Sequence, residues 1–264
     1  MRDELEASIR RELEGAEARV SLLMTDLDSG AVLHTYRADE AVSSASTIKV
    51  PILLAALEAV RQGRLTLDTP VGVPAADILD DTEEFEYGAC VCALSELLYW
   101  MIVSSDNTAT NVLIKLLGFD AVNAYAAPLG LRRTVLARKM LDFKARDEGR
   151  DNITSAADMA VLFSALYHRR ILTLPLCQTA LDILLRQRST DLFLRYITDP
   201  VTVAHKTGGL DSTGHNAVAH DAGIFYLGNI RYYLGIFVTE APDETRYAHR
   251  LIGRLSKALY DAYK

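Results

Sequence analysis

The stretch Ala45-Ser46-Thr47-Ile48-Lys49-Val50-Pro51, followed by the apolar run 52–60, is the part of the sequence around which the fold is organised. Ser46 and Lys49 are three positions apart, so on a helix they share one face and lie within side-chain reach. The run behind them is interrupted only by Glu58, and a helix that is apolar on every side belongs in a protein interior. We therefore expect a hydroxyl and an amine at the N-terminal end of a buried helix, where free backbone N–H groups favour negative charge. This position suits a serine nucleophile, although Ser-x-x-Lys alone is too short a pattern to establish one.

The composition of the 264-residue chain is that of an ordinary globular protein, with half of its residues apolar and about a quarter charged. The net charge of -7 argues against nucleic acid or an anionic membrane as a partner, because both are bound by basic surfaces. No apolar run is long enough to span a bilayer. We expect a monomer that binds neither nucleic acid nor membrane.

The N-terminus, Met1-Arg2-Asp3-Glu4-Leu5-Glu6, lacks the positive end and apolar core of a secretory signal. We therefore expect a cytoplasmic protein as the chain is written, or a secreted or periplasmic one if a leader has been removed. Cys90, Cys92 and Cys177 are odd in number, and the first two are too close in sequence to bridge comfortably. No histidine lies near them at zinc-site spacing, so we expect reduced, packed thiols and no metal.

Strand signals lie near the two ends of the chain, and helix signals lie between them. Alternating residues and turn residues predict strands at 20–25, 31–36, 201–206, 216–227 and 230–239. Periodicity and capping residues predict a terminal helix at 3–14, the buried helix ending at Gly63, and helices at 94–103, 107–117, 121–127, 154–167, 175–187 and 243–263. The segment 68–86, rich in Pro, Asp and Gly, predicts a polar surface excursion.

This order predicts an α/β (α+β) fold, in which one antiparallel sheet is assembled from both termini and flanked by helices, with an inserted all-helical lobe. We expect a discontinuous sheet domain, 1–42 and 200–264, and a helical domain, 43–199. A cleft between two such lobes is the natural place for a ligand.

Two further sequence patterns strengthen the case that Ser46 and Lys49 are catalytic. Ser105-Asp106-Asn107 lies between two predicted helices, where its side chains can project from a corner. Lys206-Thr207-Gly208-Gly209 ends a predicted strand, and its glycines let a ligand approach the backbone closely. Each pattern alone also suits a helix cap or a strand end.

Together, in this order and at these approximate separations, the three patterns resemble those of the penicillin-recognising serine enzymes. The chain is similar to class A serine β-lactamases and the related penicillin-binding proteins over nearly its whole length. The resemblance implies a β-lactamase-like fold, a small-molecule substrate (a β-lactam or a D-alanyl peptide) and hydrolysis of a cyclic amide through an acyl-enzyme. It implies no metal and no organic cofactor.

The resemblance also implies a role for each motif residue. Ser46 would attack the amide carbonyl to form the acyl-enzyme. Lys49 would act as the base once burial and a cationic neighbour such as Lys206 lower its pKa from about 10.4. Ser105 would pass a proton to the departing nitrogen.

The remaining motif residues would bind the substrate. Asn107 would hold its amide side chain, and the N–H groups of Ser46 and Gly209 would form the oxyanion hole beside Gly208. Lys206 and Thr207 would receive its carboxylate through charge-assisted hydrogen bonds.

The chain departs from class A enzymes in the loop before residue 154. Arg138 and Asp151 resemble the ion pair that closes this loop, but the Glu and Asn that follow the Arg by two and six positions are here Met140 and Lys144. A methionine cannot take a proton from the water that releases the acyl group. Asp142 is a possible replacement carboxylate, and the alternative is that it fixes loop backbone. The acylation machinery is thus complete, whereas the deacylation machinery is not.

A second departure is the strand after Lys206, which lacks the Arg that often neutralises the substrate carboxylate in the family. His215 or His220 is the nearest candidate to compensate for it. A lone histidine is more often structural or exposed.

Three hypotheses therefore stay open. The leading one is a class A β-lactamase that is acylated readily and turns over slowly. The first alternative is a D-alanyl-D-alanine carboxypeptidase or transpeptidase, which Met140 favours and the missing export signal opposes. The second is a β-lactam or muropeptide receptor that is acylated once and does not recycle.

Overall fold

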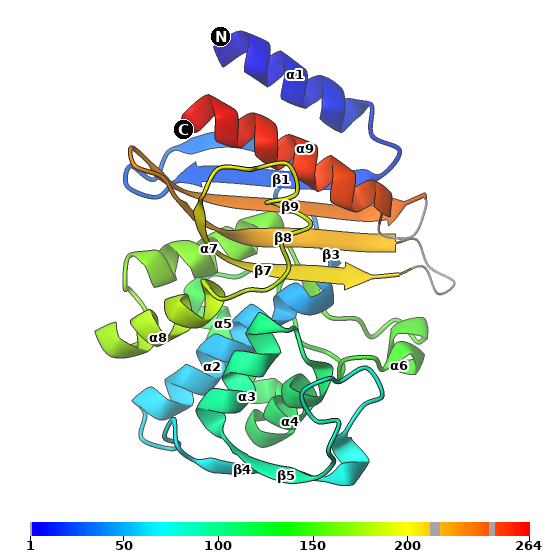
Figure 1. The fold of residues 1–264 in the computed structure, drawn as a ribbon, viewed down its shortest axis with the longest axis vertical. Helices are drawn as coiled ribbons and strands as arrows, with labels where there is room; N and C mark the ends of the chain where they lie inside the picture. Colours follow the sequence, from blue (N-terminus) through cyan, green and yellow to red (C-terminus); the bar gives the residue numbers. More distant parts are fainter. Residues whose placement is uncertain (1, 212–216, 243–245) are drawn as a thin grey trace.

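The structure, a computed structural model, describes residues 2–211, 217–242 and 246–264 (Figure 1). Its centre is a five-stranded antiparallel sheet in the order β2-β1-β9-β8-β7. The strands are β1 (Arg19–Asp26), β2 (Val32–Tyr36), β7 (Thr202–Leu210), β8 (Ala217–Tyr226) and β9 (Arg231–Ala241). The first strand pairs with the last, which confirms the predicted sheet built from both ends of the chain.

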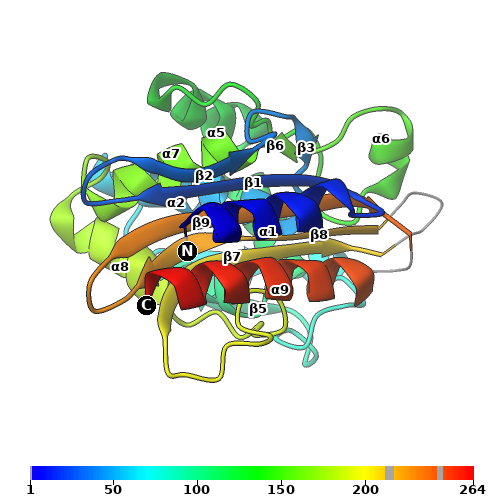
Figure 2. The ribbon, with the colours of Figure 1, turned by 90° about the horizontal axis from the view of Figure 1, so that it is seen from above.

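The outer face of this sheet is covered by the two terminal helices, α1 (Arg2–Glu14) and α9 (Arg246–Tyr263), as Figure 2 shows. We call the apolar side chains between these helices and the sheet the outer cluster; it includes Ile9, Leu22, Phe225, Leu251 and Leu255. The predicted hairpin of the last two strands is also present. It has a two-residue loop that the Leu227 N–H closes by donating to the Ile230 carbonyl at 3.0 Å.

The opposite, inner face carries the helices from the middle of the chain: α2 (Lys49–Arg61), α3 (Leu94–Val103), α4 (Asn107–Leu117), α5 (Phe119–Ala126), α6 (Phe143–Asp147), α7 (Ala156–Tyr167) and α8 (Leu174–Leu184). Short 3-10 turns occur at η1 (Ala45–Ile48), η2 (Ala75–Asp77) and η3 (Ala127–Leu129). As predicted, α2 is buried, with α3, α4, α5 and α8 packed against it. We call this second body of apolar side chains the inner cluster; it includes Ile52, Leu54, Leu98, Leu113 and Phe163.

Two small sheets were not predicted. Strand β4 (Pro70–Val73) lies inside the segment expected to be irregular and pairs with β5 (Cys90–Ala93). The buried Val71 and Val73 alternate with exposed Pro70 and Gly72, and a proline is tolerated at the start of an edge strand. The other pair, β3 (Val42–Ser43) and β6 (Ile153–Thr154), joins segments far apart in sequence. Such short segments become strands because they pair with a distant segment, and a local sequence pattern does not reveal that pairing.

The three cysteines are free thiols in the structure: Cys90 is exposed, Cys92 is half-buried and Cys177 is buried. Across the described ranges no single helix has the length and hydropathy of a membrane span. One helix pair, 107–117 with 119–129, passes those criteria together but is bent by 85°. Nor do the described residues include a cluster of three or more His, Cys, Asp or Glu side chains arranged to hold a metal ion.

Candidate active site

Ser46 lies in the 3-10 turn η1, at the entrance to the buried helix α2. Ala45 before it adopts a positive φ of 44°, which is uncommon for a residue other than glycine and directs the chain sharply into η1. Thr47 is buried and its hydroxyl donates to the Ser44 carbonyl at 2.6 Å. Pro51 lies in the first turn of α2, where its missing N–H removes no helical hydrogen bond. The segment that carries Ser46 is therefore fixed by the Thr47–Ser44 hydrogen bond within the turn and by the buried helix α2 that follows it.

Lys49 is fully buried, and its Nζ donates to the Ser105 carbonyl at 2.6 Å, the Ser105 Oγ at 3.0 Å and the Asn107 Oδ1 at 2.7 Å. Among the described residues these hydrogen bonds go to Ser105 and Asn107, and not to Ser46, the neighbour expected from the spacing. Burial, reinforced by the charge of Lys206, lowers the pKa of Lys49 well below its usual range, while Asp106 and Asp81 oppose the shift. The direction is the one a lysine base requires.

Lys206 reaches the same hydroxyl from the sheet. It is fully buried on β7, and its Nζ donates to the Ser105 Oγ at 3.1 Å and to the Thr207 carbonyl at 2.8 Å. Burial lowers its pKa to about 7, opposed by Asp221. Ser105 itself has a positive φ of 59° in the turn between α3 and α4. Its oxygen accepts from both lysines, so its own proton is free to be donated.

The end of β7 lies directly against the turn that carries Ser46. A Cβ added at Gly208 would approach the Ser46 N to 3.0 Å and the Thr47 N to 3.1 Å, so a side chain there would displace η1. The same addition at Gly209 would meet nothing nearer than the Val218 carbonyl at 3.8 Å. Glycine is therefore favoured at Gly208, because a side chain there would press against the backbone of η1.

The predicted loop ion pair is present, with Arg138 Nε 2.8 Å from Asp151 Oδ1. The Ser43 hydroxyl donates to the other oxygen of Asp151 at 2.6 Å, and Arg146 Nε lies 3.5 Å from it. The Arg138 side chain is only 2% exposed. The ends of the loop 138–151 are thus closed by a buried charge pair next to β3.

Met140 is the residue that the resemblance predicts in place of the deacylating Glu of class A enzymes. It is buried, and Asn111 holds its backbone twice: the Met140 N–H donates to Asn111 Oδ1 at 2.7 Å, and Asn111 Nδ2 donates to the Met140 carbonyl at 3.1 Å. Asp142 is exposed and accepts the Ala145 N–H at 3.0 Å as the N-cap of α6, while Lys144 is exposed on that helix. The structure thus gives Asp142 a backbone-fixing contact, and its catalytic role stays a prediction.

His220 does not offer a free nitrogen to a substrate. It is fully buried on β8; its Nε2 donates to the Ser43 carbonyl at 2.7 Å and its Nδ1 accepts the Val238 N–H at 3.2 Å. Burial lowers its pKa to about 4. His215, the other candidate, lies outside the described residues. Among the described residues, His220 therefore does not compensate for the missing Arg, and the carboxylate-binding role of Lys206 and of the buried Thr207 stays a prediction.

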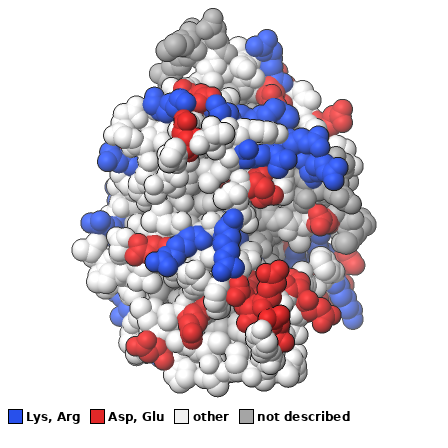
Figure 3. All heavy atoms as spheres, in the orientation of Figure 1, with Lys and Arg blue, Asp and Glu red and all other residues white. Residues whose placement is uncertain are grey.

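One site residue was missed by the sequence analysis. Asp81, on the loop between β4 and β5, accepts a hydrogen bond of 2.6 Å at its Oδ2 from Asn107 Nδ2. It lies in a run of acids within 80–86, and Figure 3 shows Asp and Glu side chains gathered over this part of the molecule. Such a run is usually a solvated surface, so nothing in the sequence distinguished Asp81 from its neighbours.

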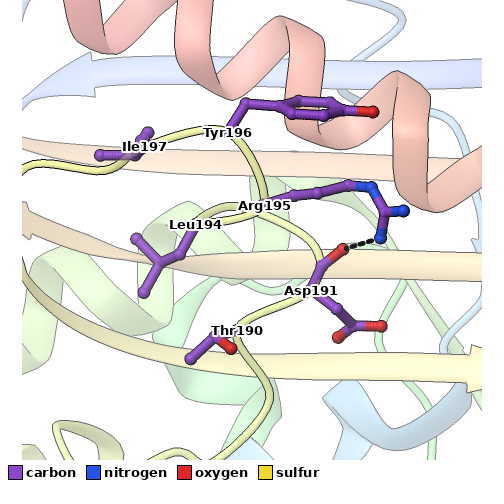
Figure 4. Close-up of a pocket in the computed structure, with 6 residues that line it drawn as sticks. All are labelled: Thr190, Asp191, Leu194, Arg195, Tyr196 and Ile197. Atoms are coloured by element: carbon purple, nitrogen blue, oxygen red, sulfur yellow. Dashed lines mark hydrogen bonds between the residues drawn. The ribbon is translucent and has the colours of Figure 1, made fainter.

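A groove of 570 Å³ lies away from this constellation, on the outer side of the sheet (Figure 4). The segment 190–197 lines it, Arg195 Nη1 donates to the Asp191 carbonyl at 3.4 Å, and Phe193 of the same segment belongs to the outer cluster. None of the motif residues lines this groove.

The match with known proteins agrees with this geometry. Residues 4–263 match the model of a family described as the β-lactamase enzyme family. A β-lactamase of Bacteroides uniformis is 26% identical over 276 aligned residues, which cover 99% of this chain and 92% of that protein.

Solved structures agree as well. A β-lactamase from Chitinophaga pinensis superimposes with a TM-score of 0.91 at 21% identity, covering 99% of this chain and 100% of that one, which shows the shared fold. The structure of PBP-A superimposes with a TM-score of 0.87 at 30% identity, covering 98% of this chain and 96% of that one. The chain therefore belongs to the β-lactamase enzyme family, as a β-lactamase-like hydrolase of the class A serine group.

Proposed function

We propose that the protein is a serine hydrolase that β-lactam amides acylate at Ser46 and that hydrolyses the acyl-enzyme slowly. The observation that carries this proposal is the Ser105 hydroxyl, which accepts hydrogen bonds from Lys49 and Lys206 beside the turn that bears Ser46. Three separate parts of the chain supply the functional groups that acylation needs.

In acylation, Ser46 Oγ bonds to the amide carbonyl carbon and its proton passes to Lys49 Nζ, which a lowered pKa makes available as the neutral amine. The C–N bond then breaks, and the departing nitrogen takes the Ser105 proton. Ser105 recovers a proton from Lys49 across their 3.0 Å hydrogen bond. The N–H groups of Ser46 and Gly209 hold the oxyanion, where each donor contributes about 2.7–4 kcal/mol to lowering the barrier.

Deacylation needs a base that activates water, and the loop supplies a thioether at Met140 in place of a carboxylate. The side chain is buried and its backbone is fixed by Asn111, so no carboxylate is held there. Asp142 is two residues away and caps α6. A site with full acylation machinery and no held base accumulates the acyl-enzyme.

The test is intact-mass measurement after one dose of benzylpenicillin. We expect the mass of one penicilloyl group on the unmodified chain, persisting for many minutes, and none on Ser46→Ala. A time course with Asp142→Asn separates the two roles of Asp142: equal persistence assigns it to the loop backbone, and faster clearance only in the unmodified chain assigns it to deacylation. No adduct on the unmodified chain would overturn the proposal.

A second candidate is a D-alanyl-D-alanine carboxypeptidase or transpeptidase, favoured by Met140 and by the 30% identity to PBP-A. It uses the same nucleophile and the same leaving-group proton donor. Release of D-alanine from a short acylated D-alanyl-D-alanine peptide, lost in Ser46→Ala, would support it; no release at millimolar peptide would count against it.

The third candidate, a receptor acylated once, rests on Met140 standing where a loop carboxylate is expected. Turnover of a chromogenic cephalosporin distinguishes it from an enzyme. A stoichiometric burst without a following steady state supports the receptor, and any steady rate that Ser46→Ala abolishes excludes it.

A further inference from the structure

We propose that Asp81 selects substrates whose acyl side chain carries an ammonium group on the carbon next to the amide carbonyl that Asn107 binds. This inference rests on the proposed function and adds a substrate class to it.

The first support is the fixed orientation of the Asn107 amide. Its Oδ1 accepts from Lys49 Nζ at 2.7 Å, and its Nδ2 donates to Asp81 Oδ2 at 2.6 Å. An amide nitrogen carries two N–H donors, so one is directed at Asp81 and the second stays available for a substrate carbonyl. Asp81 is exposed, so its carboxylate is open to solvent and to a ligand.

The second support is that the loop holding Asp81 is tied to the motif on both sides of this residue. The Leu79 N–H donates to Thr108 Oγ1 at 2.9 Å, and the Thr82 hydroxyl donates to Asp106 Oδ2. Asp106 also caps α4 by accepting the Ala109 N–H. The carboxylate is therefore part of the built site and not a freely moving surface group.

Simple geometry then places the partner. The two N–H bonds of one amide diverge by about 120°, so a carbonyl oxygen accepting the second one at about 2.9 Å lies about 5 Å from Asp81 Oδ2. An ammonium on the carbon adjacent to that carbonyl is close enough to pair with Asp81 directly or through one water. A carboxylate at the same place would be repelled.

The neighbouring acids do not make the same contact. Asp80, Glu83 and Glu86 are exposed, and Glu84 lies 3.4 Å from Arg188 across the rim. Because only Asp81 among them bonds to Asn107, Glu83→Gln is a matched control that removes the same charge from the same loop.

The experiment compares two penicillins that differ only in this group, α-aminobenzylpenicillin and benzylpenicillin, by the second-order rate constant for Ser46 acylation at pH 6.5. For each protein we take the ratio of the two rate constants, amino compound over benzylpenicillin. We expect this ratio to be about three- to tenfold higher in the unmodified chain than in Asp81→Asn, which is the size that an exposed to half-buried charge pair allows. Taking that quotient cancels the difference in intrinsic reactivity. Glu83→Gln and Asp81→Glu should keep the preference, and raising the pH above about 9, past the α-amino pKa of about 7.7–8.0, should remove it.

A wild-type measurement makes the test independent of variant folding. α-Carboxybenzylpenicillin should acylate the unmodified chain more slowly than benzylpenicillin, which should be slower than the amino compound. Equal rates for all three, or a ratio that Asp81→Asn leaves unchanged, would overturn the inference and leave the proposed function intact. Acylation by none of them would overturn the proposed function itself.

Discussion

Two buried lysines, Lys49 and Lys206, donate to one acceptor, the Ser105 Oγ, at 3.0 and 3.1 Å. Neither has a carboxylate as a direct partner among the described residues. Two ammonium groups this close in a buried site repel each other, and burial disfavours each of them as well. The protein environment thus favours one neutral amine beside one hydroxyl whose proton is free, which is the pairing that the proposed acylation requires.

At Met140, the proposed function predicts that one side chain decides whether the acyl-enzyme persists or is hydrolysed. Met140→Glu places a carboxylate on a backbone already fixed by Asn111, and a positioned general base contributes about 10²–10⁴-fold. We expect the benzylpenicilloyl adduct to decay at least about tenfold faster than in the unmodified chain, followed by intact mass. Met140→Gln, similar in size but without a base, should decay like the unmodified chain; equal decay of the two variants would refute the idea.

At His220 the expected effect concerns stability. Its pKa is lowered from 6.5 to about 4 by burial, so between these values the unfolded chain binds a proton that the folded chain does not. The contribution of neutral His220 to the free energy of unfolding is therefore fully present above pH 6.5 and is lost as the pH falls toward 4. The loss is about 3 kcal/mol, at about 1.36 kcal/mol per pH unit.

His220→Gln keeps a donor and an acceptor for Ser43 and Val238 but does not titrate. Urea unfolding at pH 7.5, 6.0 and 4.5 should show a steeper loss for the unmodified chain than for this variant. Parallel losses would show that the acid sensitivity originates elsewhere.

At the scale of elements, the loop 138–151 depends on its closing ion pair. Arg138→Met leaves the half-buried Asp151 with the Ser43 hydroxyl, the Asn152 N–H and the more distant Arg146, and breaking a buried pair costs about 3–5 kcal/mol. We expect a loss near 3 kcal/mol in the free energy of unfolding. Amide hydrogen exchange over the loop should be faster.

The matched control for this loop is Arg150→Met, which breaks an exposed pair with Glu148 (Arg150 side chain 60% exposed). Such a pair contributes no more than about 1 kcal/mol. Similar losses in both variants would show that the buried pair does not close the loop.

The helices flanking Ser105 show which elements are predictable from sequence. Helices α3 and α4 begin and end at the predicted residues, because their signals are local: Asp106 caps α4, and Gly118 follows its last turn with a positive φ. The strands β4 and β5 have no such local signal. Only the structure reveals that they pair with each other on either side of the acidic loop.

The candidate site divides in the same way. Ser46, Lys49, Ser105 and Lys206 were identified from three short motifs and their order, and the structure brings Lys49, Ser105 and Lys206 together beside the Ser46 turn. Asp81 was not identifiable, because its place depends on hydrogen bonds between a surface loop and the residues around Asn107. The role of Asp142 was open for a different reason, because the sequence allowed both a catalytic carboxylate and the local backbone cap that the structure shows.

At the scale of the whole molecule, the two faces of the sheet differ in function: the outer face contributes to stability, and the inner face also packs the helix that carries Lys49. Leu255 on α9 and Leu54 on α2 are both buried, one in the outer and one in the inner cluster. Truncating either to alanine should cost about 2–5 kcal/mol. Only Leu54→Ala disturbs the helix that positions Lys49, so we expect it to slow Ser46 acylation at least threefold, against less than twofold for Leu255→Ala.

Both variants must be compared where each is fully folded, by penicillin labelling and intact mass. A slowing in Leu255→Ala as large as in Leu54→Ala would show that the outer face also shapes the site.

The pairing of β1 with β9, with Arg19 opposite Thr239, has a consequence for how the protein is made. A ribosome releases β1 and the apolar helix α2 long before β9 exists, so the nascent chain exposes them without their final neighbours. The sheet is completed only after synthesis has almost ended. A premature stop codon before β9 would therefore remove the middle of the sheet and not its edge, and such a product is expected to depend on chaperones or to be degraded.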